Sequence, residues 1–118
     1  MRDMSIMLVE DDLDFRAGLS RALARKGARV VAEATTLAEA REALGSPAPD
    51  LVLVDFGLPD GVGLELVREM TTAASTARCV LMSMHDDPAY HVEAEAAGAL
   101  GFAPKHRLWE ALERLLAV

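Results

Sequence analysis

Four apolar runs in this chain each end in polar side chains of a different kind. Glu10 and Asp11 follow the first run, Asp55 the second, Ser83 the third and Lys105 the fourth. The runs are residues 6–9, 51–54, 80–82 and 101–104. Short apolar runs are typical of strands buried in a parallel sheet, and ligands bind such sheets beyond the carboxyl ends of the strands. We therefore expect an acidic cluster, a hydroxyl group and an ammonium group to meet at one edge of a sheet.

The acidic residues at this edge predict a site for a divalent cation. Two carboxylates about 5 Å apart repel each other by roughly 3 kcal/mol at an effective dielectric constant of about 20. Glu10, Asp11 and Asp55 must therefore take up protons, move apart or bind a cation. Oxygen ligands with access to solvent suit Mg²⁺ better than zinc or copper. Mg²⁺ leaves coordination positions for a phosphoryl oxygen, so the cluster predicts phosphoryl-transfer chemistry.

Asp55 is the candidate nucleophile of this chemistry. A carboxylate can become an aspartyl-phosphate, whose three phosphoryl oxygens then need partners. The cation could bind one oxygen, the Ser83 hydroxyl a second and the Lys105 ammonium a third. A lone Ser or Lys at a strand end is usually structural or solvated. The functional hypothesis depends on the joint occurrence of these residues, one at each strand end.

The elements that must position these residues alternate between strand and helix along the whole chain. Strands are predicted near residues 5–9, 29–34, 51–54, 79–82 and 100–103, each followed by a helix, with a loop at 57–61 before the third helix. This alternation implies parallel strand pairing, right-handed crossovers and a three-layer sandwich. We expect an α/β fold of the flavodoxin type, a five-stranded parallel sheet in the order 2-1-3-4-5 flanked by five helices.

Local signals predict several helix ends and buried helix faces. Thr36 and Glu39 fit a capping box at the start of the second helix. Asp86 or Asp87 is expected to cap the fourth helix, and Gly98 to end it. The predicted buried residues are Phe15, Leu19, Ala22 and Leu23 in the first helix, Leu64, Val67 and Met70 in the third, Val92, Ala94, Ala96 and Ala97 in the fourth, and Leu108, Leu112, Leu115 and Leu116 in the fifth.

Length and composition narrow the function classes. The 118 residues fit one domain, 1–118, and a hydrophobic content of 52% argues against disorder. The net charge of −7 argues against a domain that binds nucleic acid or an anionic membrane by itself. The one cysteine, Cys79, rules out an internal disulfide and is expected in the core. The first apolar run is too short for a signal peptide or a membrane span, so the default expectation is a cytoplasmic location.

The segments at the strand ends resemble the receiver domain of bacterial two-component response regulators. They are LVEDD at 8–12, LVDFGLPDG at 53–61, LMS at 81–83 and AGALGFAPK at 97–105. The resemblance implies that Asp55 accepts a phosphoryl group from a histidine kinase or a phosphotransfer protein. It implies Mg²⁺ or Mn²⁺ as the cofactor, ligated by Asp55 and directly by Asp11. The backbone carbonyl of Gly57 would be a further ligand, and Glu10 would act largely through water.

The resemblance also implies a signalling switch rather than an enzyme. Ser83 would be the switch hydroxyl, Lys105 the cation that contacts the phosphoryl group, and Phe102 the aromatic residue whose rotamer follows activation. Phosphorylation would draw Ser83 inward, let Phe102 turn into the vacated space and remodel the surface of the fourth helix, fifth strand and fifth helix. That surface would control an output domain or a downstream protein, and could support homodimerisation after phosphorylation. The domain itself would contact neither nucleic acid nor membrane.

Several positions near the site are specific to this chain. His106 stands where the family commonly has Pro, so we expect a trans peptide bond there; members with helix-turn-helix output domains often lack this Pro too. Met84 follows the switch serine and could shield the phosphoryl group. Gly57 and His85 occupy positions that tune phosphate loss in the family. His85 could orient a water or simply be exposed, and we favour exposure; His91 and His106 are expected to be solvated.

Two other function classes also fit parts of this pattern. A small Mg²⁺-dependent phosphatase could form an aspartyl-phosphate, but such enzymes usually carry a second acid two residues after the nucleophile, where this chain has Gly57. We also expect no cap domain of the kind that such enzymes carry. A phosphorylation-independent scaffold would keep the fold without the switch, and the intact set of Asp55, Ser83 and Lys105 argues against it.

Overall fold

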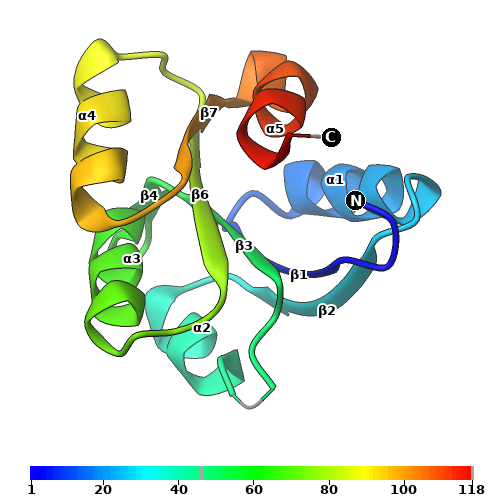
Figure 1. Ribbon diagram of the computed structural model, residues 1–118, viewed down its shortest axis with the longest axis horizontal. Helices are drawn as coiled ribbons and strands as arrows, with labels where there is room; N and C mark the ends of the chain where they lie inside the picture. Colours follow the sequence, from blue (N-terminus) through cyan, green and yellow to red (C-terminus); the bar gives the residue numbers. More distant parts are fainter. Residues whose placement is uncertain (46, 118) are drawn as a thin grey trace.

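Five parallel strands form the central sheet of the computed structural model, which describes residues 1–45 and 47–117 (Figure 1). The strands are β1 (Ser5–Val9), β2 (Arg29–Ala34), β3 (Leu51–Asp55), β6 (Arg78–Ser83) and β7 (Gly101–Pro104). Their spatial order is β2-β1-β3-β6-β7, and every neighbouring pair is parallel. The predicted order 2-1-3-4-5 is confirmed, with β6 and β7 as the fourth and fifth strands of the sheet.

Helices cover both faces of the sheet, which gives the three layers predicted from the sequence (Figure 1). They are α1 (Leu13–Arg25), α2 (Leu37–Ala43), α3 (Gly63–Thr72), α4 (Pro88–Ala97), the short 3₁₀ helix η1 (Lys105–Arg107) and α5 (Leu108–Leu116). One buried cluster joins the sheet to α1 and α5, and the other joins it to α2, α3 and α4. All five residues of β3 are buried, as expected of a central strand covered on both faces.

The caps at the helix ends follow the sequence signals closely. The Thr36 side chain accepts a hydrogen bond from the Glu39 N–H at 3.0 Å, while Glu39 Oε1 accepts from the N–H of Thr35, one residue before the position that the capping box predicts. Asp87 rather than Asp86 caps α4, through the N–H of Ala89 at 2.9 Å. Gly98 ends α4 with a φ of +105°, a left-handed conformation that favours glycine.

Three local predictions need correction. The segment expected as a loop contains the two-residue strands β4 (Gly57–Leu58) and β5 (Gly61–Val62), which pair antiparallel. On α4, Ala94 and Ala97 are buried, but Val92 is 69% exposed and Ala96 is exposed, because the helical period places those two positions away from the sheet. Leu115 of α5 and, on α1, Phe15 and Ala22 are only partly buried.

Candidate functional site

The predicted site residues meet at one edge of the sheet because they occupy the same level in neighbouring parallel strands. Val9 pairs with Val54 across β1 and β3, so Glu10 and Asp55 stand side by side at the strand ends. Asp55 pairs with Met82 across β3 and β6, and Ser83 lies one residue beyond. Ser83 in turn pairs with Pro104 of β7, directly before Lys105. The register therefore brings the four strand ends together as the sequence predicted.

The acidic cluster has the compactness that cation binding requires. One carboxylate oxygen each from Glu10, Asp11 and Asp55 lies within 4.8 Å of the other two. Glu10 is fully buried and Asp55 nearly so, whereas Asp11 is exposed and opens the cluster to solvent. Glu10 Oε2 accepts a hydrogen bond from the N–H of Asp12 at 3.2 Å. Glu10 Oε1 is buried and makes no hydrogen bond of good geometry within the described residues, although it lies 2.6 Å from the Lys105 ammonium.

Lys105 is the cation of the site. Its Nζ lies 2.6 Å from Glu10 Oε1 and 3.4 Å from Asp55 Oδ1, and it lies over the ring of Phe15 at 4.6 Å from the centroid. The side chain is 7% exposed. Burial would lower the pKa of Lys105, but the close contact with Glu10 and the charges of both carboxylates outweigh burial and raise it. Lys105 is therefore an ammonium group at neutral pH and can serve as a phosphate ligand.

Asp55 carries a strongly perturbed carboxyl group. Burial and then the negative charge of Glu10 raise the pKa of Asp55 to about 7, although the Lys105 ammonium opposes this shift. Even with that ammonium counted against the three carboxylates, the ionised cluster remains doubly negative. An oxygen-only donor set that is open to solvent at Asp11 fits a hard divalent cation such as Mg²⁺.

Comparison with known proteins decides the family of this chain. The family model described as the response regulator receiver domain matches residues 6–116. The chain belongs to the response regulator receiver domains.

Individual relatives agree with this assignment. The receiver domain is 33% identical over 103 residues to the DNA-binding transcriptional activator DevR/DosR of Mycobacterium tuberculosis. The matched region covers 86% of this chain and 48% of DevR/DosR. The receiver domain is also 30% identical over 103 residues to the response regulator UvrY of Escherichia coli (strain K12), and this match covers 86% of this chain and 47% of UvrY. The chain thus spans about half the length of the curated relatives it matches.

Solved structures show the same fold. A LuxR-family two-component response regulator from Aurantimonas sp. SI85-9A1 has a TM-score of 0.85 at 34% identity and covers 97% of this chain and 85% of its own. The non-phosphorylated HemR receiver domain from Leptospira biflexa has a TM-score of 0.84 at 28% identity. This superposition covers 98% of this chain and 95% of the HemR chain. This is a receiver domain of two-component signalling, related to transcriptional regulators.

None of its described helices combines the length and apolar character that a membrane span needs.

The residues around the Ser83 hydroxyl of the receiver domain differ in their exposure to solvent. Ser83 is 7% exposed, and its Oγ accepts a hydrogen bond from the N–H of His85 at 3.1 Å. The hydroxyl proton is therefore available for donation, since a serine carries one donor and two acceptor positions. The His85 side chain is exposed as expected, and Met84 is 65% exposed at the rim of the site. Gly57 is exposed at the start of β4.

Phe102, the aromatic residue predicted to respond to activation, is buried. Phe102 is 1% exposed, with its ring centroid 4.8 Å from that of His91 and 5.6 Å from that of Tyr90. The His91 side chain is 40% exposed, so the expectation that it is solvated is confirmed only in part: Nε2 lies 2.9 Å from Asp86 Oδ1. Asp86 also pairs with Arg107 at 3.0 Å. Any change in Phe102 on activation would have to alter its contacts with α4.

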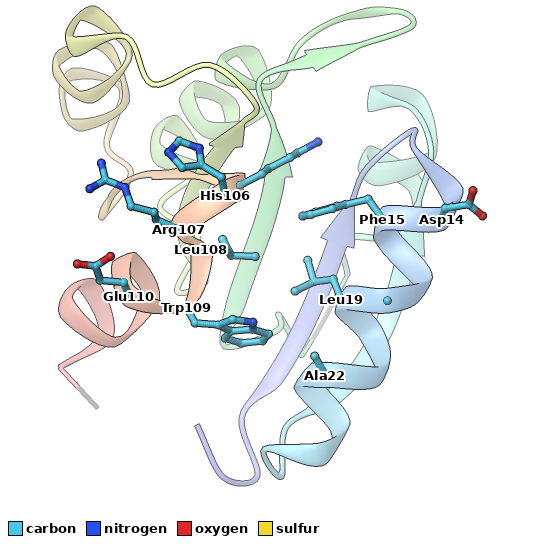
Figure 2. A pocket seen from close by; sticks show the side chains of 11 residues that line it. Asp14, Phe15, Leu19, Ala22, His106, Arg107, Leu108, Trp109 and Glu110 are labelled. Atoms are coloured by element: carbon cyan, nitrogen blue, oxygen red, sulfur yellow. The ribbon is translucent and has the colours of Figure 1, made fainter.

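A hollow of about 480 Å³ lies beside the acidic cluster, between α1 and the η1–α5 segment (Figure 2). Leu19 and Ala22 line its α1 side, and Trp109 lies opposite them on α5 (Figure 2). Lys105 also lines it, so the hollow adjoins the site. The Lys26 ammonium lies over the Trp109 ring in a cation–π contact, 4.8 Å from the ring centroid. The hollow thus shares Lys105 with the site, but Glu10, Asp11 and Asp55 do not line it.

Three supporting residues were missed by sequence reasoning. A Cβ on Gly63 would overlap the Asp55 carbonyl oxygen and lie 2.9 Å from Cγ2 of Val54, so α3 begins directly against the end of β3. The carboxylate of Asp60 accepts hydrogen bonds from the N–H groups of Leu37 and Ala38, at 2.8 and 3.0 Å, and ties the β4–β5 segment to α2. Arg16 contacts the Glu10 carbonyl. Gly63 had one sequence signal, a glycine at the start of a helix where stronger helix formers are usual.

Proposed function

We propose that Asp55 of this receiver domain accepts a phosphoryl group from a phosphohistidine on a histidine kinase or a phosphotransfer protein. The observation that carries the proposal is the position of Asp55, inside a compact acidic cluster and 3.4 Å from the Lys105 ammonium. One domain, 1–118, would contain all residues of the reaction. Its role is that of a phosphoacceptor in signalling, not of an enzyme that turns over a substrate.

The reaction needs the Asp55 carboxylate in its ionised form. An Asp55 oxygen attacks phosphorus, the phosphorus–nitrogen bond of the phosphohistidine breaks, and the electron pair leaves on the imidazole. Asp11, Asp55 and the backbone carbonyl of Gly57 would hold Mg²⁺ or Mn²⁺, which would neutralise charge on the phosphoryl oxygens and favour the ionised carboxylate. Glu10 would act on the ion mainly through water.

Ser83 and Lys105 would bind the phosphoryl oxygens that remain. The Ser83 hydroxyl already accepts from the N–H of His85, so its proton can be donated to a phosphoryl oxygen. Lys105 would exchange part of its contact with Glu10, now 2.6 Å long, for a charge-assisted hydrogen bond to the phosphoryl group. Gly57, Met84 and His85, at the edge of the site, would set how fast water removes the phosphate.

Phosphorylation would then shift the receiver domain between two conformations. Movement of Ser83 at the end of β6 would be passed to Phe102 on the neighbouring strand β7, and through its ring contacts to His91 of α4. The α4–β7–α5 surface would control an output domain or a downstream protein, and phosphorylation could promote homodimerisation there. Because DevR/DosR is a DNA-binding transcriptional activator, we propose transcription control as the output, exerted by another part of the regulator.

Intact-protein mass spectrometry tests this function against its alternatives. We expect the wild-type protein, incubated with Mg²⁺ and a small phosphodonor or a cognate kinase, to gain the mass of one phosphoryl group. The gain should vanish in chelator and in Asp55→Asn. Repeated turnover of a phosphate ester would instead indicate a phosphatase. No incorporation under any of these conditions would indicate a phosphorylation-independent scaffold and would contradict the proposal.

A further inference from the structure

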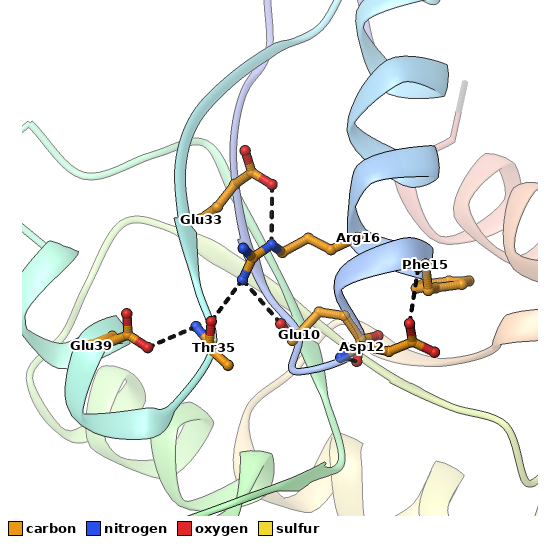
Figure 3. A network of polar contacts seen from close by, with 7 residues as sticks. All are labelled: Glu10, Asp12, Phe15, Arg16, Glu33, Thr35 and Glu39. Atoms are coloured by element: carbon orange, nitrogen blue, oxygen red, sulfur yellow. Dashed lines mark hydrogen bonds and ion pairs between the residues drawn. The ribbon is translucent and has the colours of Figure 1, made fainter.

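One arginine of α1, Arg16, contacts the backbone of Glu10 and joins three segments of the chain (Figure 3). Arg16 Nη1 donates to the backbone carbonyl of Glu10 at 3.2 Å and to Thr35 Oγ1 at 3.0 Å. Its Nε lies 3.2 Å from Glu33 Oε1. The Arg16 side chain is 19% exposed. One rigid, permanently charged group thus connects α1, the end of β1 and the last part of β2.

The hydrogen bond from Arg16 to the Glu10 carbonyl acts on the backbone that carries the acidic residues. This carbonyl belongs to the peptide unit between Glu10 and Asp11, whose atoms lie in one plane. A hydrogen bond to this oxygen therefore fixes the orientation of that unit and the direction in which the exposed Asp11 side chain leaves the backbone. The N–H of Glu10 is fixed separately, by the carbonyl of Ala34 at 2.9 Å. Arg16 supplies the second constraint on the turn that carries two of the three acids.

A guanidinium group so close to a cation site would ordinarily weaken it by repulsion. Here Glu33 pairs with the Arg16 guanidinium and offsets its charge, while Thr35 holds Nη1 from the other side. The charge of Arg16 is thus largely compensated within its own network, and its hydrogen-bond geometry remains. This arrangement favours a role in orientation over a role in the electrostatics of the cluster.

We propose that Arg16 is a positioning residue that orients the Glu10–Asp11 peptide unit for divalent-cation binding. The inference deepens the proposed function and rests on it. Residues that orient ligands typically change metal affinity by about 10- to 100-fold when they are removed. The competing explanation is a tie between α1 and β2 that stabilises the fold without affecting the cation site.

Equilibrium Mn²⁺ binding to the full chain, followed by the electron paramagnetic resonance signal of free Mn²⁺, separates these explanations. We expect Arg16→Met to bind Mn²⁺ at least about 10-fold more weakly than wild type, at a temperature where circular dichroism shows it folded. Arg16→Lys, which can still donate to one or two of the three acceptors, should recover part of the affinity. Arg21→Met is the matched control, because it removes the same charge from an exposed position of the same helix and should bind like wild type.

Each outcome decides something different. A wild-type protein that binds no Mn²⁺ would overturn the proposed function and this inference with it. A wild-type protein that binds Mn²⁺, together with a folded Arg16→Met that binds it equally well, would overturn only the inference. Should Arg16→Met fail to fold, Arg16→Lys decides the matter, since an unchanged affinity in that variant would show that the geometry of the guanidinium is not needed.

Discussion

Asp55→Asn is expected to be more stable than the wild-type protein in metal-free buffer at pH 8, by about 3 kcal/mol in the free energy of unfolding. The cause is the charge that the native fold forces on a nearly buried carboxylate. Burial and the repulsion of Glu10 raise the pKa of Asp55 to about 7, against the smaller opposing effect of Lys105. An asparagine of similar shape removes that charge. The same substitution that abolishes phosphorylation should thus strengthen the fold.

The pH dependence of stability follows from the same shift. Because the folded-state pKa of Asp55 lies above its ordinary value of 3.8, the folded protein holds a proton between those values that the unfolded chain has lost. The wild-type free energy of unfolding should therefore fall by about 2–3 kcal/mol from pH 5 to pH 8 through this group, and Asp55→Asn should lack this fall. Millimolar Mg²⁺ should restore stability to the wild type at pH 8, since the cation binds the native cluster.

Urea unfolding at pH 5 and pH 8, with and without chelator, measures both effects. Asp14→Asn is the control, because it removes a carboxylate at an exposed position of α1 and should change stability by less than about 0.5 kcal/mol. Equal stability of wild type and Asp55→Asn at pH 8 in chelator would show that the site does not strain the Asp55 carboxylate.

Gly63→Ala is expected to slow phosphate incorporation by about 100-fold, because a displacement of roughly 1 Å at a reacting group has an effect of that size. The new Cβ would overlap the carbonyl oxygen of Asp55 itself, so either the end of β3 or the start of α3 must move. Initial rates of labelling by a small phosphodonor in Mg²⁺, normalised to the folded fraction, give the comparison. Overpacking of this kind should also lower the free energy of unfolding by about 1–3 kcal/mol.

Gly57→Ala is the matched control for that experiment. A Cβ at Gly57 would meet no atom within 4 Å, and the proposed metal ligand there is the backbone carbonyl, which alanine retains. Its initial labelling rate should therefore stay close to that of wild type, whatever happens to the later loss of phosphate. A Gly63→Ala protein that labels as fast as Gly57→Ala would contradict the argument that α3 sets the position of Asp55.

The sheet and the acidic edge could be predicted because their signals are local. Each buried strand is a short apolar run, and the residue type at its end is visible in the sequence. Parallel pairing then brings those ends to one edge whatever the details of packing. The predictions for Glu10, Asp55 and Lys105 needed nothing more, and the structure places the Lys105 ammonium 2.6 Å from Glu10 and 3.4 Å from Asp55.

The supporting residues could not be predicted, because each depends on distances between elements that are remote in sequence. Arg16 reaches Thr35 across 19 positions, and nothing local distinguishes it from the exposed arginines of the same helix. The overlap that makes Gly63 necessary exists only once α3 is packed against β3. On α4, the scattered small residues fit more than one buried face, and the packing of Tyr90 and His91 over Phe102 decides which face is buried.

A crystal structure of the protein with Mg²⁺ and beryllium fluoride, which adds to carboxylates as a phosphoryl analogue, tests the central claim most directly. The account predicts beryllium fluoride bound through beryllium to an Asp55 carboxylate oxygen, and the cation bound by Asp11, Asp55 and the Gly57 carbonyl. It also predicts fluorine atoms within hydrogen-bond distance of Ser83 Oγ and Lys105 Nζ. A cation bound away from the acidic cluster, or an Asp55 without the adduct while Lys105 keeps its contact with Glu10, would contradict it.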